Sequence, residues 1–377
     1  MTVGRTYLDY NATAPLRPEA RAAMLAALDL VGNPSSVHAE GRRARAVIEA
    51  ARTKVAALAG AAAADVVFTS GATEANATVL AAKWDTIFLS ALEHDSVRDA
   101  SKRSGARLVE VPLNADGQFS RAKFEALVVR HKVDGIGRAL VSLQLANNET
   151  GALQPVLEVG VIARLHGVRL HCDAVQAPGR IPVNAAALGV DYLTLSAHKI
   201  GGPKGVGTLV IVDGAPLPAL IAGGGQERGR RSGTENVAGI AGFGAAAEVA
   251  LEDLLTVDRI ETLRNALEQG IREITPHAAV LCQGAPRLPN TSCVALPGMA
   301  AETTVIRMDL AGVAVSAGAA CSSGKIGHSA ALEAMGLTRD LARTAIRFSL
   351  GYATTREDID AFLAAWKMQT AAQSRAA

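Results

Sequence analysis

The stretch DYLTLSAHKIGGPKGVGTLVIV, residues 191–212, decides the fold. Its two apolar runs, 191–196 and 205–212, predict two strands, and the polar, glycine-rich segment between them contains Lys199. Earlier in the chain, five more short apolar runs alternate with helical patterns, at residues 66–69, 85–90, 106–112, 138–146 and 168–173. Alternation of strands and helices predicts an α/β fold with a mainly parallel sheet and helices on both of its faces.

The alternation stops near residue 250. A helical stretch from Glu248 to Ile274 is followed by short strand-like pieces and then by helix again to the end. We therefore expect a large domain over residues 14–250 and a smaller α+β lobe made of residues 1–13 and 251–377. The N-terminal arm is expected to pack on the smaller lobe.

The composition excludes several classes of protein. Hydrophobic residues make up 49% and charged residues 20% of the 377 residues, which is ordinary for a globular chain and excludes disorder. The 38 basic residues balance the 36 acidic residues, so we expect neither nucleic acid nor an anionic membrane as a partner. No apolar run is long enough for a membrane span, and no signal peptide is expected.

Four cysteines lie far apart, at positions 172, 282, 293 and 321. They form no CxxC pair, which argues against a disulfide framework or a metal site and predicts free thiols in a reducing cytoplasm. Cys172 and Cys293 lie in apolar runs and are expected in the core. Cys321 lies among small and polar residues in SAGAACSSGK, where a loop thiol near Lys325 can act as a thiolate nucleophile.

Polar side chains follow neighbouring strands of the predicted sheet. Asp173 ends the run 168–173, and Lys199 follows the run 191–196, so both are expected at the ligand-binding edge of the sheet. A partly desolvated lysine can form a Schiff base, and a neighbouring aspartate suits the protonated ring nitrogen of pyridoxal phosphate. Either residue alone would be an ordinary boundary residue, but the pair favours this cofactor.

Other strand ends offer further candidates. The helix start after the run 66–69 can bind a phosphate group, and the candidate residues are Gly71, Ala72 and Thr73. An ordinary capped helix has the same sequence pattern. His94 can stack on a planar ring and move protons, or lie on the polar surface. Asn148 can donate to a ring hydroxyl or a carboxylate, or form a turn.

Two basic features have two interpretations each. The glycine-rich loop 223–234 is either a flexible solvated loop or an anion-binding loop that completes a phosphate site across a dimer interface. Arg347, in AIRFSLG, is either a structural ion-pair donor or a fork that binds a carboxylate.

Together these segments resemble the cysteine desulfurases, pyridoxal-phosphate enzymes of the class V aminotransferase superfamily, and their long-loop group in particular. The match covers about residues 7–352 in order: YLDYNATAP, GNPSS, VVFTSGATEAN, EHDSV, NNETG, HCDAVQ, SAHKIGGPKGVG, RSGTEN, SAGAACSSG and IRFSLG. The resemblance implies the type I fold of pyridoxal-phosphate enzymes and a homodimer.

The resemblance also implies the roles of the site residues. Lys199 would hold the cofactor, and His94 would stack on its ring and take part in proton transfer. The other expected cofactor contacts are Asp173 at the ring nitrogen, Gln176 and Asn148 near the ring hydroxyl, and, at the phosphate, Thr73, Ser196, His198 and the second subunit's Thr234. Arg347, with Asn148, would hold the substrate carboxylate.

The implied reaction takes sulfur from L-cysteine, gives L-alanine and leaves a persulfide on Cys321. Acceptors would be a scaffold for iron–sulfur cluster assembly, with a transient cluster contact at Cys321, or the machinery of tRNA thiolation. Two alternatives remain: another class V enzyme, such as an aminotransferase or selenocysteine lyase, and an inactive scaffold partner. The chain departs from the family pattern after Cys321, where it reads SSGKIGH, so the identity of the acceptor is open.

Overall fold

The computed structural model describes residues 4–114, 116–133, 135, 137–318 and 329–374. Its largest sheet has seven strands in the order β2-β8-β7-β6-β5-β3-β4. Each strand lies within one of the seven apolar runs predicted as strands. They are β2 (Val66–Thr69), β3 (Thr86–Leu89), β4 (Arg107–Glu110), β5 (Ala139–Gln144), β6 (Arg169–Asp173), β7 (Tyr192–Ser196) and β8 (Gly207–Ile211).

The sheet is mainly parallel, as predicted. Strands β4, β3, β5, β6 and β7 pair in parallel, whereas β8 runs antiparallel to both β7 and β2. The exception follows from the connection between β7 and β8, which contains Lys199 in a short 3-10 helix, η1 (Ala197–Lys199). This connection is too short for the crossover that a parallel neighbour would need, so the chain returns antiparallel.

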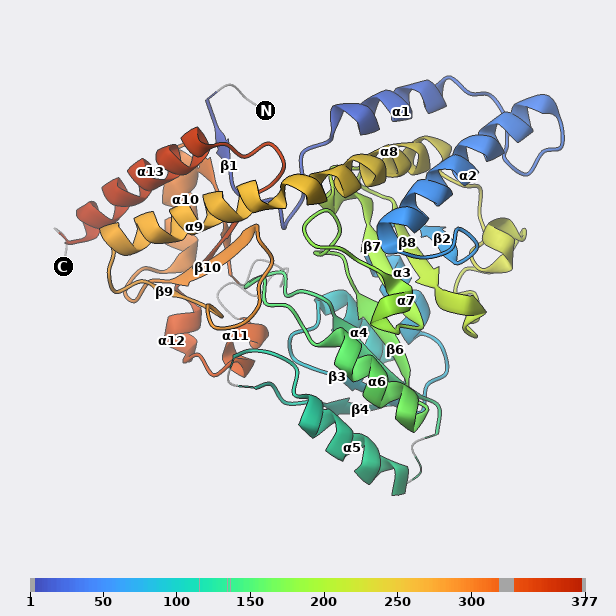
Figure 1. Ribbon diagram of the computed structural model, residues 1–377, viewed down its shortest axis with the longest axis horizontal. Coiled ribbons are helices and arrows are strands. Elements are labelled where there is room, and N and C mark those ends of the chain that lie inside the picture. Colours follow the sequence, from blue (N-terminus) through green and yellow to red (C-terminus); the bar gives the residue numbers. More distant parts are fainter. Residues whose placement is uncertain (1–3, 115, 134, 136, 319–328, 375–377) are drawn as a thin grey trace.

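Helices cover both faces of this sheet (Figure 1). Phe68 packs in a core with α2, α5, α6 and α8, whereas its neighbour Val67 packs in a second core with α3 and α4, as the alternation of side chains along a strand requires. The helices of this part are α1 (Pro18–Leu28), α2 (Ala39–Ala59), α3 (Ala72–Leu80), α4 (Asp95–Arg103), α5 (Arg121–Val133), α6 (Val156–His166), α7 (Ala185–Leu188) and α8 (Val237–Asp253).

A smaller antiparallel sheet, in the order β12-β13-β10-β9, lies beside the first part (Figure 1). Its strands are β9 (Ala279–Val280), β10 (Thr291–Ala295), β12 (Ser316–Ala317) and β13 (Ala345–Ser349). The helices around it are α9 (Val257–Ile274), α10 (Ala301–Leu310), α11 (Ala330–Ala334), α12 (Arg339–Ala342) and α13 (Arg356–Ser374). The N-terminal arm packs here as predicted, because β1 (Thr6–Tyr7) pairs in parallel with β11 (Val313–Ala314).

The prediction of one long helical stretch over residues 248–274 is wrong in one respect. The structure has two helices, α8 and α9, separated by a 3-10 turn at Leu254–Thr256. Helix α8 packs on α1 and α2, whereas α9 packs on α13, so the chain changes neighbours at this turn. The domain boundary drawn near residue 250 stays a prediction.

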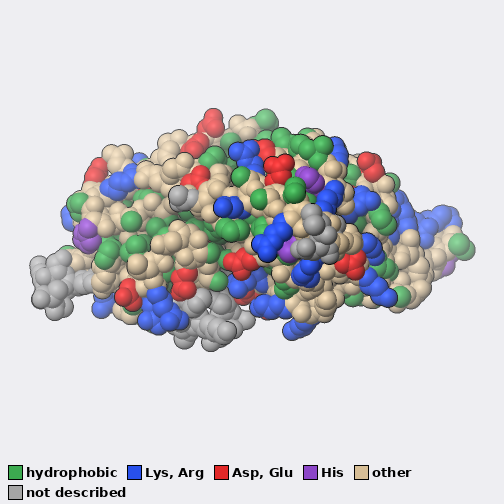
Figure 2. Space-filling view, turned by 90° about the horizontal axis from the view of Figure 1, so that it is seen from below, with side chains coloured by type: hydrophobic (Ala, Val, Ile, Leu, Met, Phe, Trp, Pro, Cys, Tyr) green, Lys and Arg blue, Asp and Glu red, His purple; other side chains and the backbone are tan. Residues whose placement is uncertain are grey.

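The surface carries charges of both signs. Figure 2 shows lysine and arginine side chains beside aspartate and glutamate side chains on one face of the molecule. Within the described residues, no helix combines the length and the apolar character that crossing a membrane requires. The same residues contain no group of His, Cys, Asp or Glu side chains that could hold a metal ion.

Candidate active site

A cavity of about 430 Å³ lies at the carboxyl ends of the parallel strands. Ten of the residues predicted for the site line it: Gly71, Ala72, Thr73, His94, Asn148, Asp173, Gln176, Ser196, His198 and Lys199. They come from segments far apart in the sequence, and the sheet brings them together because each follows a strand. The volume of the cavity is in the range of small-molecule binding sites.

Lys199 ends the 3-10 turn after β7 and reaches the N-terminal arm. Its Nζ donates hydrogen bonds to the backbone carbonyl oxygens of Asn11 and, at 3.0 Å, Ala12. The arm therefore holds the amine at the edge of the cavity. Asn11 is not among the residues predicted for the site, although the YLDYNATAP motif contains it.

Asp173 is the last residue of β6, the strand next to β7. Its Oδ2 accepts a hydrogen bond from Asn76 Nδ2 at 2.9 Å, and its Oδ1 accepts one from the backbone N–H of Val175 at 3.1 Å. The carboxylate is therefore held from two sides. Asn76, on α3, was missed as a functional residue, although it ends the quoted motif SGATEAN.

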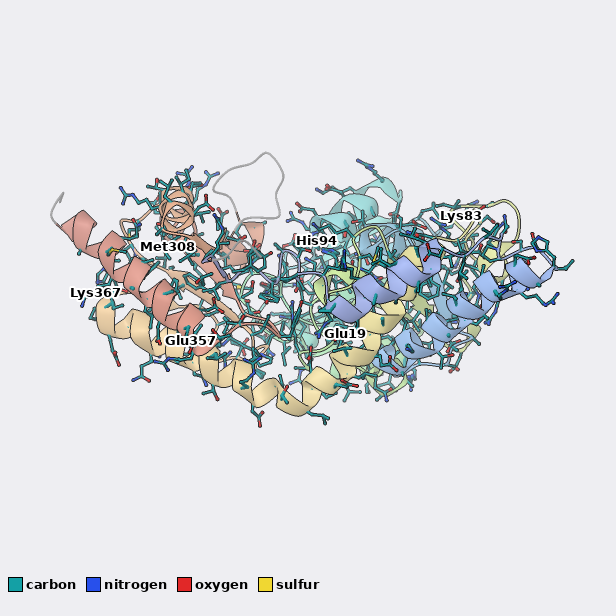
Figure 3. The ribbon with its side chains drawn as sticks, turned by 90° about the horizontal axis from the view of Figure 1, so that it is seen from above. Glu19, Lys83, His94, Met308, Glu357 and Lys367 are labelled. Carbon is teal, nitrogen blue, oxygen red and sulfur yellow. The ribbon has the colours of Figure 1, made fainter. Side chains whose placement is uncertain are left out.

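His94 caps the N-terminus of α4, and Figure 3 shows it near the middle of the molecule. Its Nδ1 accepts a hydrogen bond from the backbone N–H of Ser96 at 3.1 Å and lies 2.8 Å from Ser96 Oγ. Because Nδ1 accepts from a backbone N–H, the neutral ring carries its proton on Nε2. Ser96 in turn accepts from Asn76 Nδ2 at 2.9 Å, which joins His94 to the contacts of Asp173.

The expected phosphate cup lies where β2 leads into α3. Gly71 caps this helix, and strand β8 passes so close that a Cβ on Gly207 would lie 2.6 Å from the carbonyl carbon of Gly71. On the other side, His198 Nδ1 lies 3.1 Å from Thr13 Oγ1. Burial, followed by the charges of Lys199 and Lys204, lowers the pKa of His198 to about 4, so the ring is neutral near pH 7.

The observed contacts do not match the alternative prediction, an ordinary helix cap formed by Thr73 and Glu74. The structure places Gly71 at the cap position without a side-chain hydrogen bond. Glu74 instead accepts a hydrogen bond from the backbone N–H of Ser70 at 2.8 Å and pairs with Arg231 at 2.9 Å. The side chain of Thr73 is left to line the cavity.

Gln176 and Arg347 are tied to backbone groups around the cavity. Gln176 Nε2 donates to the Asn11 carbonyl at 3.1 Å. Arg347, on β13, is almost fully buried, pairs with Asp9 at 2.7 Å and donates to the carbonyl of Asn148 at 3.1 Å. The structure thus places Arg347 behind Asn148, and not among the residues that line the cavity.

The loop 223–234 is more ordered than a solvated loop. It contains a 3-10 turn over Gln226–Gly229, and the buried Glu227 accepts hydrogen bonds from Arg52 at 2.6 Å and from the backbone N–H of Phe68 at 3.0 Å. Thr234 is exposed and does not line the cavity of its own chain. Cys321 lies outside the described residues.

The cavity thus gathers an amine, an imidazole, a carboxylate and a helix N-terminus at one sheet edge. The model of the family described as aminotransferase class-V matches residues 6–362 of the chain.

The chain belongs to the class V aminotransferase family.

Its relatives within this family are cysteine desulfurases. The chain is 42% identical to the cysteine desulfurase of Cereibacter sphaeroides, over 95% of this chain and 94% of that protein. It is 40% identical to the cysteine desulfurase IscS of Dictyoglomus turgidum, over 94% and 91% of the two chains. The solved structure of a NifS-like protein from Rickettsia africae has a TM-score of 0.88 and 34% identity, and covers 97% of this chain and 99% of that chain.

These matches confirm the resemblance, the type I fold and a function as a cysteine desulfurase of class V. They also confirm the cofactor, because members of this family use pyridoxal phosphate. The carboxylate, imidazole, hydroxyl and amine groups that line the cavity are the groups that this cofactor requires of its binding site.

Two buried acids of this class V enzyme were missed by the sequence analysis. Glu93 Oε1 accepts from the backbone N–H of Gln144 at 2.9 Å, and burial, with a contribution from the charge of Asp173, holds the pKa of Glu93 well above its usual range. Glu149 Oε2 accepts from Ser329 Oγ at 2.6 Å, and burial raises the pKa of Glu149 to about 7. Both lie within quoted motifs, Glu93 in EHDSV and Glu149 in NNETG, but burial cannot be seen in a motif.

Proposed function

We propose that this chain removes the sulfur atom of L-cysteine, releases L-alanine and carries the sulfur as a persulfide on Cys321. The observation that carries the proposal is the placement of Lys199 and Asp173 at the ends of adjacent strands, in one cavity. The curated relatives named cysteine desulfurases support it.

The lining residues fit pyridoxal phosphate, which supplies an electron sink for the carbon atoms of the substrate when bound. Lys199 would hold it covalently through Nζ. Asp173, oriented by Asn76, would keep the ring nitrogen protonated, because an adjacent carboxylate favours the cationic form. Gln176 and Asn148 would face the ring hydroxyl.

The phosphate group would lie at the N-terminus of α3. Backbone N–H groups of Gly71 and Ala72 and the hydroxyls of Thr73 and Ser196 supply donors, and the helix terminus adds positive potential. His198 lines the same cavity as a neutral ring, so it would act as a hydrogen-bonding group and not as a charge.

Proton transfers are assigned to Lys199 and His94. Once displaced from the cofactor, the amine of Lys199 would take the proton from the substrate Cα, and the arm carbonyls of Asn11 and Ala12 would accept from the ammonium group. The ring of His94 is oriented by Ser96, so that Nε2 is the atom that exchanges protons.

The substrate carboxylate is assigned to Arg347 together with Asn148. Arg347 pairs with Asp9 and donates to the Asn148 carbonyl in this structure, so the substrate carboxylate would have to replace Asp9 as its partner. A planar fork of this kind suits a carboxylate.

Sulfur transfer is assigned to the thiolate of Cys321. A bond would form between Cys321 Sγ and the substrate sulfur as the substrate Cβ–S bond breaks. The bonding pair stays with the carbon, which takes up a proton to become the methyl group of alanine. An acceptor protein, such as a scaffold for iron–sulfur clusters or a tRNA-thiolating partner, would then take the sulfur.

A cytoplasmic location and a homodimer are part of the proposal. The first is supported by Cys172, Cys282 and Cys293, which are free thiols and suit a reducing compartment. The second is supported by the exposed Thr234, which would serve the phosphate site of a second subunit.

Two variants test the proposal. Cys321→Ala should bind pyridoxal phosphate with the wild-type visible spectrum but form no persulfide and no alanine above background. Lys199→Ala should lose the covalent attachment, so borohydride treatment would leave no cofactor on the denatured chain. Alanine formation by Cys321→Ala at the wild-type rate would overturn the assignment of the sulfur acceptor.

A further inference from the structure

A second cavity of about 100 Å³ lies on the other side of Lys199, between the two parts of the molecule. It shares Lys199 with the cavity described above, and is otherwise lined by different residues. Its walls come from the N-terminal arm, the turn between α8 and α9, and the loop after β13. A space of this size holds several water molecules, and hence one small polyatomic ion.

Arg180 lines this cavity and is nine-tenths buried. Its Nη1 donates to the backbone carbonyl and to Oε1 of Gln176, at 3.0 and 2.6 Å, and its Nη2 donates to the carbonyl of Tyr10 at 3.4 Å. Among the described residues, none accepts a hydrogen bond from its Nε and none forms a salt bridge with it. A buried guanidinium without a carboxylate partner is costly, so this arrangement needs an explanation.

The electrostatics of Arg180 agree with a missing counter-ion. Burial lowers its pKa to about 9, and the charge of Arg347, a second cation, lowers the pKa further in the same direction. The buried Arg52 differs from Arg180, because its pairing with Glu227 raises its pKa.

The other charges of the cavity leave an excess of positive charge. Arg17 is paired with Asp253, the one acidic residue of the lining. Arg259 is exposed, and it donates to the carbonyls of Thr354 and Tyr352 at 2.6 and 2.8 Å without a salt bridge to any residue in the described part of the chain. Two arginines without carboxylate partners therefore face one small polar space.

We infer that this cavity is a binding site for a small oxyanion of the size of phosphate or sulfate, held by Arg180 and Arg259. Arginine suits such ions because its planar fork donates two hydrogen bonds to neighbouring oxygen atoms. The contacts with Gln176 and Tyr10 hold the guanidinium of Arg180 in place before the ion arrives. The ion would supply the negative charge that Arg180 and Arg259 do not receive from a carboxylate.

The test uses the enzyme loaded with pyridoxal phosphate, so that the cofactor's own phosphate cannot be mistaken for the ion. Calorimetric titration with inorganic phosphate, and separately with sulfate, is compared with sodium chloride at equal ionic strength. We expect one saturable site in the wild type. Arg259→Ala should bind phosphate about tenfold more weakly, because one charge-assisted contact is lost.

Arg130→Ala is the matched control, since Arg130 is an exposed arginine on α5, away from the cavity. It should bind phosphate like the wild type. Arg180→Lys keeps the charge but not the fork, and is expected to bind more weakly than Arg259→Ala. The inference is overturned if the wild type shows no site beyond the chloride control, or if Arg259→Ala and Arg130→Ala bind equally.

Discussion

Asn76 reaches Asp173 and Ser96 from α3 and thereby connects the expected partners of the cofactor ring. Replacing it with alanine removes a hydrogen bond to a carboxylate, which is worth about 1.5–3 kcal/mol. We expect Asn76→Ala to bind pyridoxal phosphate at least about tenfold more weakly. Absorbance titration of the apoenzyme measures the change, with the exposed Asn265→Ala on α9 as a control. Equal affinity in the two variants would show that Asp173 needs no support from α3.

Glu149 makes stability depend on pH. Its pKa rises from 4.5 to about 7 on folding, chiefly through burial, so the folded chain binds more protons than the unfolded chain between these values. The free energy of unfolding therefore falls as pH rises through this window, by roughly 3 kcal/mol for this group if the shift is fully expressed. Glu149→Gln removes the titrating group while its amide oxygen can still accept from Ser329.

Urea unfolding at pH 5 and at pH 8 checks the effect of Glu149. The free energy of unfolding of Glu149→Gln minus that of the wild type should be larger at pH 8 than at pH 5. The exposed Glu158→Gln on α6 should show no such pH dependence. A constant difference between Glu149→Gln and the wild type at both pH values would mean that Glu149 keeps its ordinary pKa.

At the scale of elements, the close approach of β8 to the start of α3 shapes the phosphate cup. A Cβ on Gly207 would lie 2.6 Å from the backbone of Gly71, and backbone cannot move aside as a flexible side chain can. Gly207→Ala should therefore lower stability by about 1–3 kcal/mol and weaken cofactor binding. Urea unfolding and cofactor titration measure both effects.

Gly284→Ala is the control for Gly207→Ala, because a Cβ at Gly284 meets no atom within 4 Å. It should keep wild-type stability and cofactor affinity. Wild-type behaviour of Gly207→Ala would show that the β8–α3 contact can relax.

At the scale of the whole molecule, Asn11 links the N-terminal arm to the turn after β5 and to the smaller sheet. Its Nδ2 donates to the Asn148 carbonyl at 3.2 Å and to Thr291 Oγ1 at 3.0 Å, and its backbone N–H donates to Ser349 Oγ at 2.9 Å. Asn11→Ala removes the two hydrogen bonds that Nδ2 donates to buried groups, which costs about 1–3 kcal/mol.

The expected loss is measured by urea unfolding, with the exposed Asn33→Ala as the control. The backbone carbonyl of Asn11 accepts from Lys199 and Gln176 and is kept in Asn11→Ala, so cofactor binding should weaken only if loss of the side-chain contacts shifts the arm. Loss of stability in both variants to the same extent would mean that the arm has no special linking role.

Much of the architecture was predictable from the sequence because strands of a parallel sheet are buried on both faces and appear as continuous apolar runs. All seven runs became strands, and Asp173 and Lys199 stand at strand ends as predicted. The break between α8 and α9 was not predictable, because the 3-10 turn at Leu254–Thr256 carries neither glycine nor proline.

The sequence by itself determined the strand order along the chain, the residue types at the strand ends and the family to which they point. The tertiary structure alone decided which of those residues share a cavity, which acids have their pKa raised by burial, and that Arg347 lies behind Asn148. It also decided that Arg180 is buried without a carboxylate. The physical reason is that burial and charge pairing depend on residues from distant segments, such as Asn11, Asn76 and Ser329, and short-range patterns carry no information about those contacts.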